Sequence, residues 1–323
     1  MADALQPFLV QGLNAISGRV EAPSLPDLIG RPGKIGFDLD FDDARKCILT
    51  DFRDRGTVAN SLAVDIARFA SASFQSVLSA SQALVSKDEI PWAFIRIYYA
   101  AYYAGHALTR MLGISCSYLD RNHIAHIQKL GIAVGRSPNF TMKASAYHCV
   151  LTSNSALLES TSLREGGGGA HEAFWDVLGE KLKEVAEQVL LQSANQSDAQ
   201  AVFAKIEAWR AKVKSHGSPL HSWLSTIRNE VQYRQAHGLW LPIGVRKHER
   251  EQLARAFEQW KRDPMEISVD GPNGGKLADF LICCAFLIAS CRVLLERISE
   301  RSEIPSKSFV KVGPLSLIVG IKA

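Results

Sequence analysis

The chain has 323 residues, of which 47% are hydrophobic and 22% charged, and its formal net charge is +4. A chain of this size and composition buries a substantial core without disulfide or metal staples, which excludes the small disulfide-rich class and the disordered class. The mild excess of basic residues permits a nucleic-acid partner but does not indicate one, because dedicated binders usually concentrate charge in a patch.

Cysteine and histidine spacing, the N-terminal residues and the most apolar stretch exclude further classes of protein. The six cysteines form no CxxC pair, and the histidines do not fall at ligand spacing, so we expect no disulfide framework, no metal and no cofactor. The N-terminus lacks the basic and apolar regions of a signal peptide. Residues 277–290 include Asp279 and precede Arg292, which indicates a segment too short and too charged to span a bilayer. We therefore expect a cytoplasmic protein without a membrane partner.

In chain order, prolines and glycines predict an irregular N-terminal segment over residues 1–57. Within it, residues 37–43 alternate apolar and acidic side chains with the period of a strand. The four aspartates there match no calcium loop, so a charged strand edge or a helix start explains them better than a metal site.

Apolar residues at helical spacing predict helices over most of the remaining chain, at residues 58–86, 91–112, 119–131, 141–159, 171–192, 199–214, 218–236, 246–262 and 275–300. The tail, 301–323, alternates around Gly313-Pro314 and predicts a β-hairpin that pairs with the N-terminal segment. The expected fold class is thus mostly α, with a helical domain at 58–300, an inserted stretch at about 114–200, and a small β element from the termini.

Glycines 166–169 lack the Lys-Ser/Thr that follows in a phosphate-binding loop, so residues 164–169 are expected to form a flexible link.

The helix at 91–112 carries polar and aromatic groups at offsets that place them on one face, namely Arg96, Tyr99, Tyr103, His106 and Arg110. Alanines and Gly105 on another face allow a neighbouring helix to approach closely. Two interpretations remain open. In the first, the tyrosines find hydrogen-bond partners in the interior; in the second, the polar face is a wall of a site that meets RNA or another subunit.

The helix at 218–236 begins with Ser218-Pro219, a favourable cap and first-turn pair. Arg228, Asn229 and Tyr233 lie near one side of it, and His237 follows Tyr233 by one turn. A guanidinium is suited to phosphate, and the amide and phenol can position a ribose or a phosphate oxygen. The alternative is structural, with Arg228 paired to an acidic residue and Tyr233 covering the core.

These two helices resemble the motif helices of the HEPN superfamily. Residues 93–108 (AFIRIYYAAYYAGHAL), followed by Gly113, look like the family's YYAxxxAxxALL…G helix, and residues 122–126 (NHIAH) stand where many relatives carry a histidine. Residues 227–233 (IRNEVQY) are similar to the family's Arg-Asn-x-x-x-His helix, with Tyr233 in place of the histidine. The resemblance spans roughly 60–300, with a longer stretch than usual between the motifs.

The resemblance implies a helical bundle of four or five helices that commonly dimerises. Many members are metal-independent endoribonucleases of toxin–antitoxin and antiviral defence systems, in which arginine and histidine promote attack of a ribose 2′-hydroxyl on the adjacent phosphate. By position, Arg228 would contact the phosphate and Asn229 would support it. Tyr233 departs from the pattern, because a tyrosine near pKa ~10 is a poor base at neutral pH. His237 or His106 could substitute.

Two functional hypotheses follow. The first is an RNA-cleaving protein of a toxin or phage-defence system, with catalytic Arg228, Asn229, Tyr233 and His237 and the other helix contacting substrate. The second is a non-catalytic binding or dimerisation module for RNA, a nucleotide or a partner protein. Under either, the expected assembly is a homodimer or a hetero-complex with a defence or antitoxin partner. A third interpretation is that the resemblance is accidental and the two helices do not meet.

Overall fold

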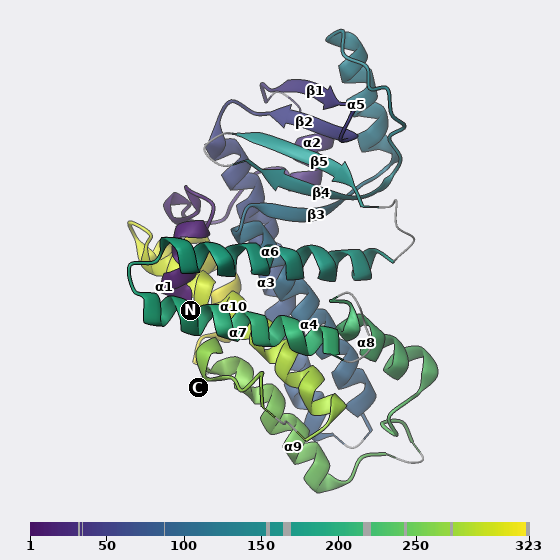
Figure 1. The fold of residues 1–323 in the computed structure, drawn as a ribbon, viewed down its shortest axis with the longest axis vertical. Helices are drawn as coiled ribbons and strands as arrows, with labels where there is room; N and C mark the ends of the chain where they lie inside the picture. Colours follow the sequence, from purple (N-terminus) through teal and green to yellow (C-terminus); the bar gives the residue numbers. More distant parts are fainter. Residues whose placement is uncertain are drawn as a thin grey trace.

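Two long consecutive helices, α3 (Arg55–Val85) and α4 (Ile90–Met111), pack along each other at the centre of the molecule (Figure 1). The computed structural model describes all residues except 32, 34, 87, 153–155, 164–168, 216–220, 242–243, 272–273 and 321–323. The carboxylate of Asp54 caps α3 by accepting from the amides of Gly56 and Thr57, and Pro91 occupies the first turn of α4. Buried alanines on both helices, among them Ala70 and Ala100, permit the close approach.

A five-stranded antiparallel sheet lies at one end of this pair, with strand order β1-β2-β5-β4-β3 (Figure 1). Its strands are β1 (Asp38–Asp42), β2 (Cys47–Asp51), β3 (Ile114–Leu119), β4 (Ser145–Leu151) and β5 (Leu157–Ser162). The acidic segment at 37–43 is confirmed as a charged edge strand, a composition that discourages pairing with other chains. The short helices α2 (Leu25–Gly30) and α5 (Arg121–Ala133) contact β3, and α5 also contacts β1.

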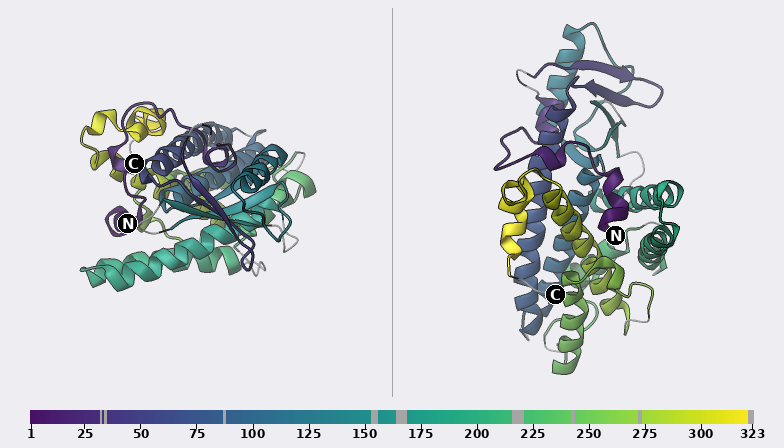
Figure 2. Two further views of the ribbon diagram at one scale, coloured as in Figure 1. Left: turned by 90° about the horizontal axis from the view of Figure 1, so that it is seen from above. Right: turned by 90° about the vertical axis from the view of Figure 1, so that its left-hand side faces the viewer.

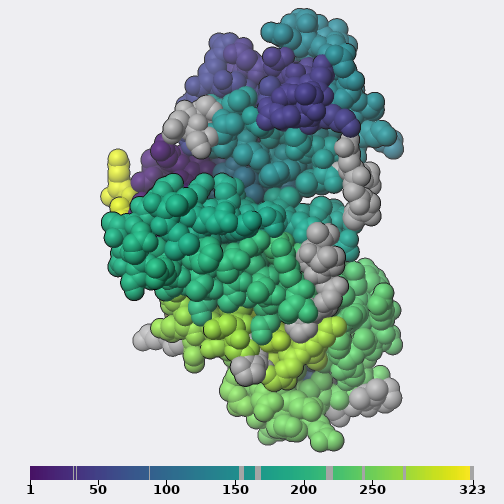
Figure 3. Space-filling model, in the orientation of Figure 1, coloured from purple at the N-terminus to yellow at the C-terminus, as the bar shows by residue number. Residues whose placement is uncertain are grey.

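The remaining helices extend the helical part. They are α6 (Ala170–Gln192), α7 (Gln196–Ser215), α8 (Trp223–Arg234), α9 (Lys247–Glu258) and α10 (Lys276–Glu300). Helices α6 and α7 pack on each other and cross the front of the molecule (Figures 1 and 3). Helices α8 and α10 pack against α4. In the right-hand view of Figure 2, α3 runs from the sheet to the end of the molecule where α9 lies. The mostly helical class is thus confirmed.

The N-terminal segment is more regular than expected. It contains α1 (Ala2–Leu5), single 3-10 turns at Gln6–Phe8 and Leu13–Ala15, and the strands β1 and β2. Val10 donates its amide to the carbonyl of Met111, 2.8 Å away, which ties this segment to the end of α4.

The prediction of a helix at 141–159 is wrong. The described residues there form β4 and part of β5, and along β4 the side chains alternate strictly between buried and half-buried. Tyr147, Cys149 and Leu151 occupy the buried positions, so the relevant period is two rather than 3.6. The sheet is therefore built largely from the middle of the chain rather than from the termini.

The predicted tail hairpin is also wrong. Residues 305–318 form a 3-10 turn at Pro305–Lys307, then α11 (Phe309–Val312) and a last 3-10 turn at Pro314–Ile318. Similar turns follow α9 at Gln259–Lys261 and Pro264–Glu266. Gly313 and Pro314 separate two turns instead of two strands. The tail folds into turns because this places the apolar side chains of Phe309, Val310 and Leu315 in the core. A single antiparallel bridge, Ser17 to Ser308, still joins the tail to the N-terminal segment.

Helix α10 is the one described helix that is long and apolar enough to cross a membrane, and 83% of its most apolar window is buried inside the protein. The apolar run at 277–290 therefore belongs to α10, in agreement with the helix predicted at 275–300. Its burial on all sides is typical of a core helix of a soluble protein.

Candidate functional site

A cluster of aromatic rings marks the place where α4 meets α6 and α8. Tyr98 of α4 is fully buried, and its hydroxyl accepts a hydrogen bond from Nε1 of Trp175, 3.1 Å away. The same hydroxyl lies 2.9 Å from Oγ of Ser225, at the start of α8, and 2.8 Å from Nδ1 of His171. Burial raises the pKa of Tyr98, so this hydroxyl keeps its proton and joins three elements through hydrogen bonds.

His171 lies in the first turn of α6 and stacks on Tyr102, with ring centroids 4.3 Å apart. It is half-buried, and its ring also contacts Tyr99 edge-on. Burial, and then the positive charge of Arg228, lower the pKa of His171 to about 4. The imidazole is therefore neutral at pH 7 and retains one nitrogen able to accept a proton.

Arg228 of α8 lies just beneath the surface, 8% exposed. Its guanidinium carbon is 5.1 Å from the ring centroid of Tyr98 and 5.9 Å from those of Tyr99 and Tyr233, distances at which a cation is attracted to an aromatic face. Nη1 of Arg228 donates to Gln232 across a long 3.4 Å, and Nε is buried without a partner. The guanidinium also interacts with the hydroxyl of Tyr98.

The other two buried arginines among the described residues, Arg110 and Arg210, each have a carboxylate partner. Arg110 donates to the carboxylate of Asp65 at 3.0 Å, and Arg210 meets Glu207 at 2.6 Å and Glu180 at 3.2 Å. Arg228 alone of the three has no carboxylate partner within the described part of the chain. Burying a guanidinium without a counter-charge is costly, so this arginine is electrostatically prepared for an anion.

The predicted stripe on α4 runs from the surface into the interior. At the surface end, Arg96 pairs with Glu89 at 3.2 Å. Tyr99 and Tyr103 follow, half-buried and with ring centroids 6.0 Å apart, and Tyr99 continues to Arg228. The structure therefore brings Arg228 next to the tyrosine part of the stripe, which links the two helices singled out in the sequence.

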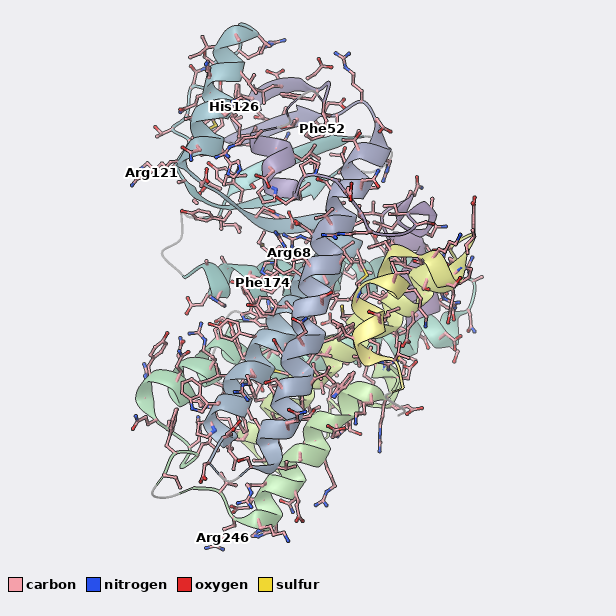
Figure 4. All side chains as sticks on the ribbon, turned by 180° about the vertical axis from the view of Figure 1, so that it is seen from behind. Phe52, Arg68, Arg121, His126, Phe174 and Arg246 are labelled. Atoms are coloured by element: carbon pink, nitrogen blue, oxygen red, sulfur yellow. The ribbon has the colours of Figure 1, made fainter. Side chains whose placement is uncertain are left out.

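The other end of the stripe is structural. The ring of His106 is stacked between Phe174 of α6 and Phe69 of α3, with centroid distances of 3.9 Å and 4.8 Å. Phe174 is labelled in Figure 4. Arg110 donates to the carbonyl of His106 and forms the buried ion pair with Asp65. Neither side chain reaches the surface, so His106 and Arg110 are poorly placed to contact substrate directly.

The remaining predicted residues separate into two groups, because α8 ends at Arg234 and His237 lies beyond it rather than one helical turn after Tyr233. Tyr233 is 69% exposed beside Arg228, and Asn229 is half-buried on the next position of the helix. His237, in contrast, donates from Nε2 to the carboxylate of Glu230 across 2.7 Å, and Lys276 also donates to that carboxylate at 3.0 Å. Burial raises the pKa of Glu230, but the hydrogen bonds of Lys276 and His237 outweigh it, so the pKa is lowered overall. His237 is thus held by its contact with Glu230. Ser218 and Pro219 lie outside the described residues, as do residues 164–168.

His171, Trp175 and Ser225 were not singled out from the sequence. The sequence signal for His171 is weak, because it appears as a polar residue at the start of an amphipathic helix. Only the crossing of α6 over α4 places it against Tyr98. Among the described residues, no group of three or more His, Cys, Asp or Glu side chains is placed to hold a metal ion.

Comparison with protein-family models, with curated proteins and with solved structures gives no match to this chain.

Proposed function

We propose that this chain is a HEPN-like, RNA-directed protein that binds single-stranded RNA at Arg228 and cleaves it without a metal ion. The observation that supports this proposal is the buried guanidinium of Arg228, which lacks a carboxylate among the described residues while the two other buried arginines have one. A backbone phosphate would supply the missing negative charge through charge-assisted hydrogen bonds.

The rings around Arg228 indicate the kind of nucleic acid. Tyr99 is half-buried and Tyr233 is largely exposed, so both offer aromatic surface beside the phosphate-binding group. Unpaired bases stack on such rings, whereas the bases of a duplex are already stacked on each other. A single strand therefore fits these groups better than a double helix.

The proposal predicts a specific response to Arg228→Met. Affinity for a fluorescent oligouridylate should fall about 10- to 100-fold in anisotropy titrations with EDTA present, because one charge-assisted phosphate contact is lost. The matched variant Arg234→Met, which removes an exposed arginine from the same helix, should change affinity much less. Unchanged affinity in Arg228→Met would contradict the proposal.

The same variant separates binding from folding. Because Arg228 is buried without a described counter-charge, its replacement by an apolar side chain of similar length should change the free energy of unfolding by less than about 1 kcal/mol. A loss of several kcal/mol would instead indicate that the arginine is part of the structural core.

A non-catalytic module of the same class is the second candidate. One observation favours it. His237 is paired with Glu230, and a phenol such as that of Tyr233 is a poor base, so neither residue supplies an available catalytic base. This alternative expects the same RNA binding without cleavage, or a stable homodimer or hetero-complex detected by mass in solution.

A further inference from the structure

His171 faces the same buried ring as Arg228. The imidazole centroid is 5.7 Å from the centroid of Tyr98, and the guanidinium carbon of Arg228 is 5.1 Å from it. The two side chains come from α6 and α8, which are separate elements, and Tyr98 of α4 holds both. Their meeting is therefore a product of the tertiary structure.

The hydrogen bonds around Tyr98 determine how His171 is presented. The Tyr98 hydroxyl accepts from Trp175, and it can donate its single proton to Ser225. In that arrangement Nδ1–H of His171 donates to Tyr98, which leaves Nε2 as an unprotonated acceptor. The His171 side chain is only half-buried, so part of it is open to solvent or a ligand.

We propose that His171 is the catalytic base of this site, and this inference rests on the proposed function. With the phosphate on Arg228, Nε2 of His171 removes the proton of the adjacent ribose 2′-hydroxyl. The 2′-oxygen forms a bond to phosphorus, and the bond from phosphorus to the 5′-oxygen breaks. The products are a 2′,3′-cyclic phosphate and a 5′-hydroxyl, whose proton comes from water, and His171 then returns its own proton to water.

Binding of the phosphate also prepares this base. The charge of Arg228 disfavours a proton on His171, and a bound phosphate would cancel that charge and favour the protonated ring. The ring of Tyr99 also faces His171, and so do Tyr98 and Tyr102, whose pKa values are raised by burial. His106 is close enough to interact electrostatically with His171, and burial lowers the pKa of His106 well below its ordinary value. Arg228 is thus the one described charge close enough to change the basicity of His171 markedly.

Two variants test the catalytic role. His171→Asn should keep the affinity of the oligouridylate within roughly threefold of wild type and lower its cleavage rate about 10²- to 10⁴-fold. His248→Asn, which alters an exposed histidine on α9, should leave both unchanged. Wild-type cleavage by His171→Asn overturns the inference and leaves the proposed function standing. A wild-type protein that binds RNA without cleaving it, or that does not bind RNA, would instead reject the proposed function itself.

The coupling to Arg228 has a readout that does not need cleavage. Proton titration of the His171 ring by NMR, assigned with His171→Asn, should show its pKa rise by about one unit or more when inorganic phosphate is added. In Arg228→Met the pKa should be higher at the start and should not respond to phosphate. A His171 pKa that phosphate leaves unchanged in the wild type overturns the coupling.

Discussion

Four histidines that are buried or half-buried have lowered pKa values in the folded protein. His106 is enclosed between Phe69 and Phe174, and burial followed by the charge of Arg110 holds its pKa well below the ordinary value. Burial likewise lowers the pKa values of His148, His171 and His221. All four are neutral in the folded protein at pH 7, whereas in the unfolded chain each takes up a proton near pH ~6.5.

This difference predicts how stability depends on pH. Below pH ~6.5 the unfolded state binds more protons than the folded state, so the free energy of unfolding falls with pH until the folded-state pKa is reached. Between pH 6 and pH 5 each such histidine removes up to about 1.4 kcal/mol, and the half-exposed His171 less. Urea unfolding at the two pH values measures the loss.

The variant His106→Gln should flatten this pH dependence, although it is less stable at pH 7, because one buried neutral imidazole is gone. His248→Gln, which changes an exposed side chain, is the matched control and should keep the wild-type slope. Equal slopes in His106→Gln and wild type would show that His106 titrates normally in the folded state.

At this scale the sequence identified residues by spacing but could not say which face of a helix is covered. Arg228, Tyr99 and Tyr103 were predicted and do lie together. His106 and Arg110 share their stripe, yet α3 and α6 cover that part of α4 and leave it in the interior. His171 could not be found, because no spacing rule connects residues 98, 171 and 228.

The contact between α3 and α4 is the main packing event at the level of elements. It encloses the ion pair of Asp65 and Arg110, whose side chains are both nearly inaccessible to solvent. Asp65 also accepts from Arg68 at 2.9 Å. Two cations thus depend on one buried carboxylate.

Removing that carboxylate should be strongly destabilising. We expect Asp65→Ala to lower the free energy of unfolding by about 3–5 kcal/mol, because Arg110 would remain buried without a partner. Replacing both partners, as Asp65→Leu with Arg110→Met, should recover most of the loss. The exposed pair of Asp38 and Arg53 provides the control, since Asp38→Ala should leave the unfolding midpoint unchanged. A mild effect of Asp65→Ala would mean that water reaches Arg110.

Long elements were predictable and short strands were not. Helices α3, α4, α6 and α10 have enough turns for the apolar period and the caps to be read from the sequence. Strands β2 to β5 have five to seven residues each, a length at which an apolar run fits a buried helix or a strand equally well. The antiparallel pairing of β2 with β5, across more than 100 residues, has no local sequence signal.

On the scale of the whole molecule, α3 connects the two parts. It contacts α2 near the sheet and α9 at the far end, and the end of α4 leads directly into β3 (Figures 1 and 2). Figure 4 places His126 at the sheet end and Arg246 at the opposite end of the same body. Because one continuous helix packs in both regions, we expect the sheet and the helices to unfold together.

The cysteines allow a direct test of that cooperativity. Cys47 and Cys149 are buried in the sheet, and Cys284 and Cys291 are buried in α10. Burial raises the pKa of each of these thiols, so they should resist alkylation while folded and react once exposed. Pulsed iodoacetamide labelling across a urea series, read by mass spectrometry, should give one midpoint for all four. Asp65→Ala should shift that shared midpoint downward in both regions, because Asp65 lies within α3. Earlier labelling of the sheet pair alone would show instead that the sheet opens as a separate unit.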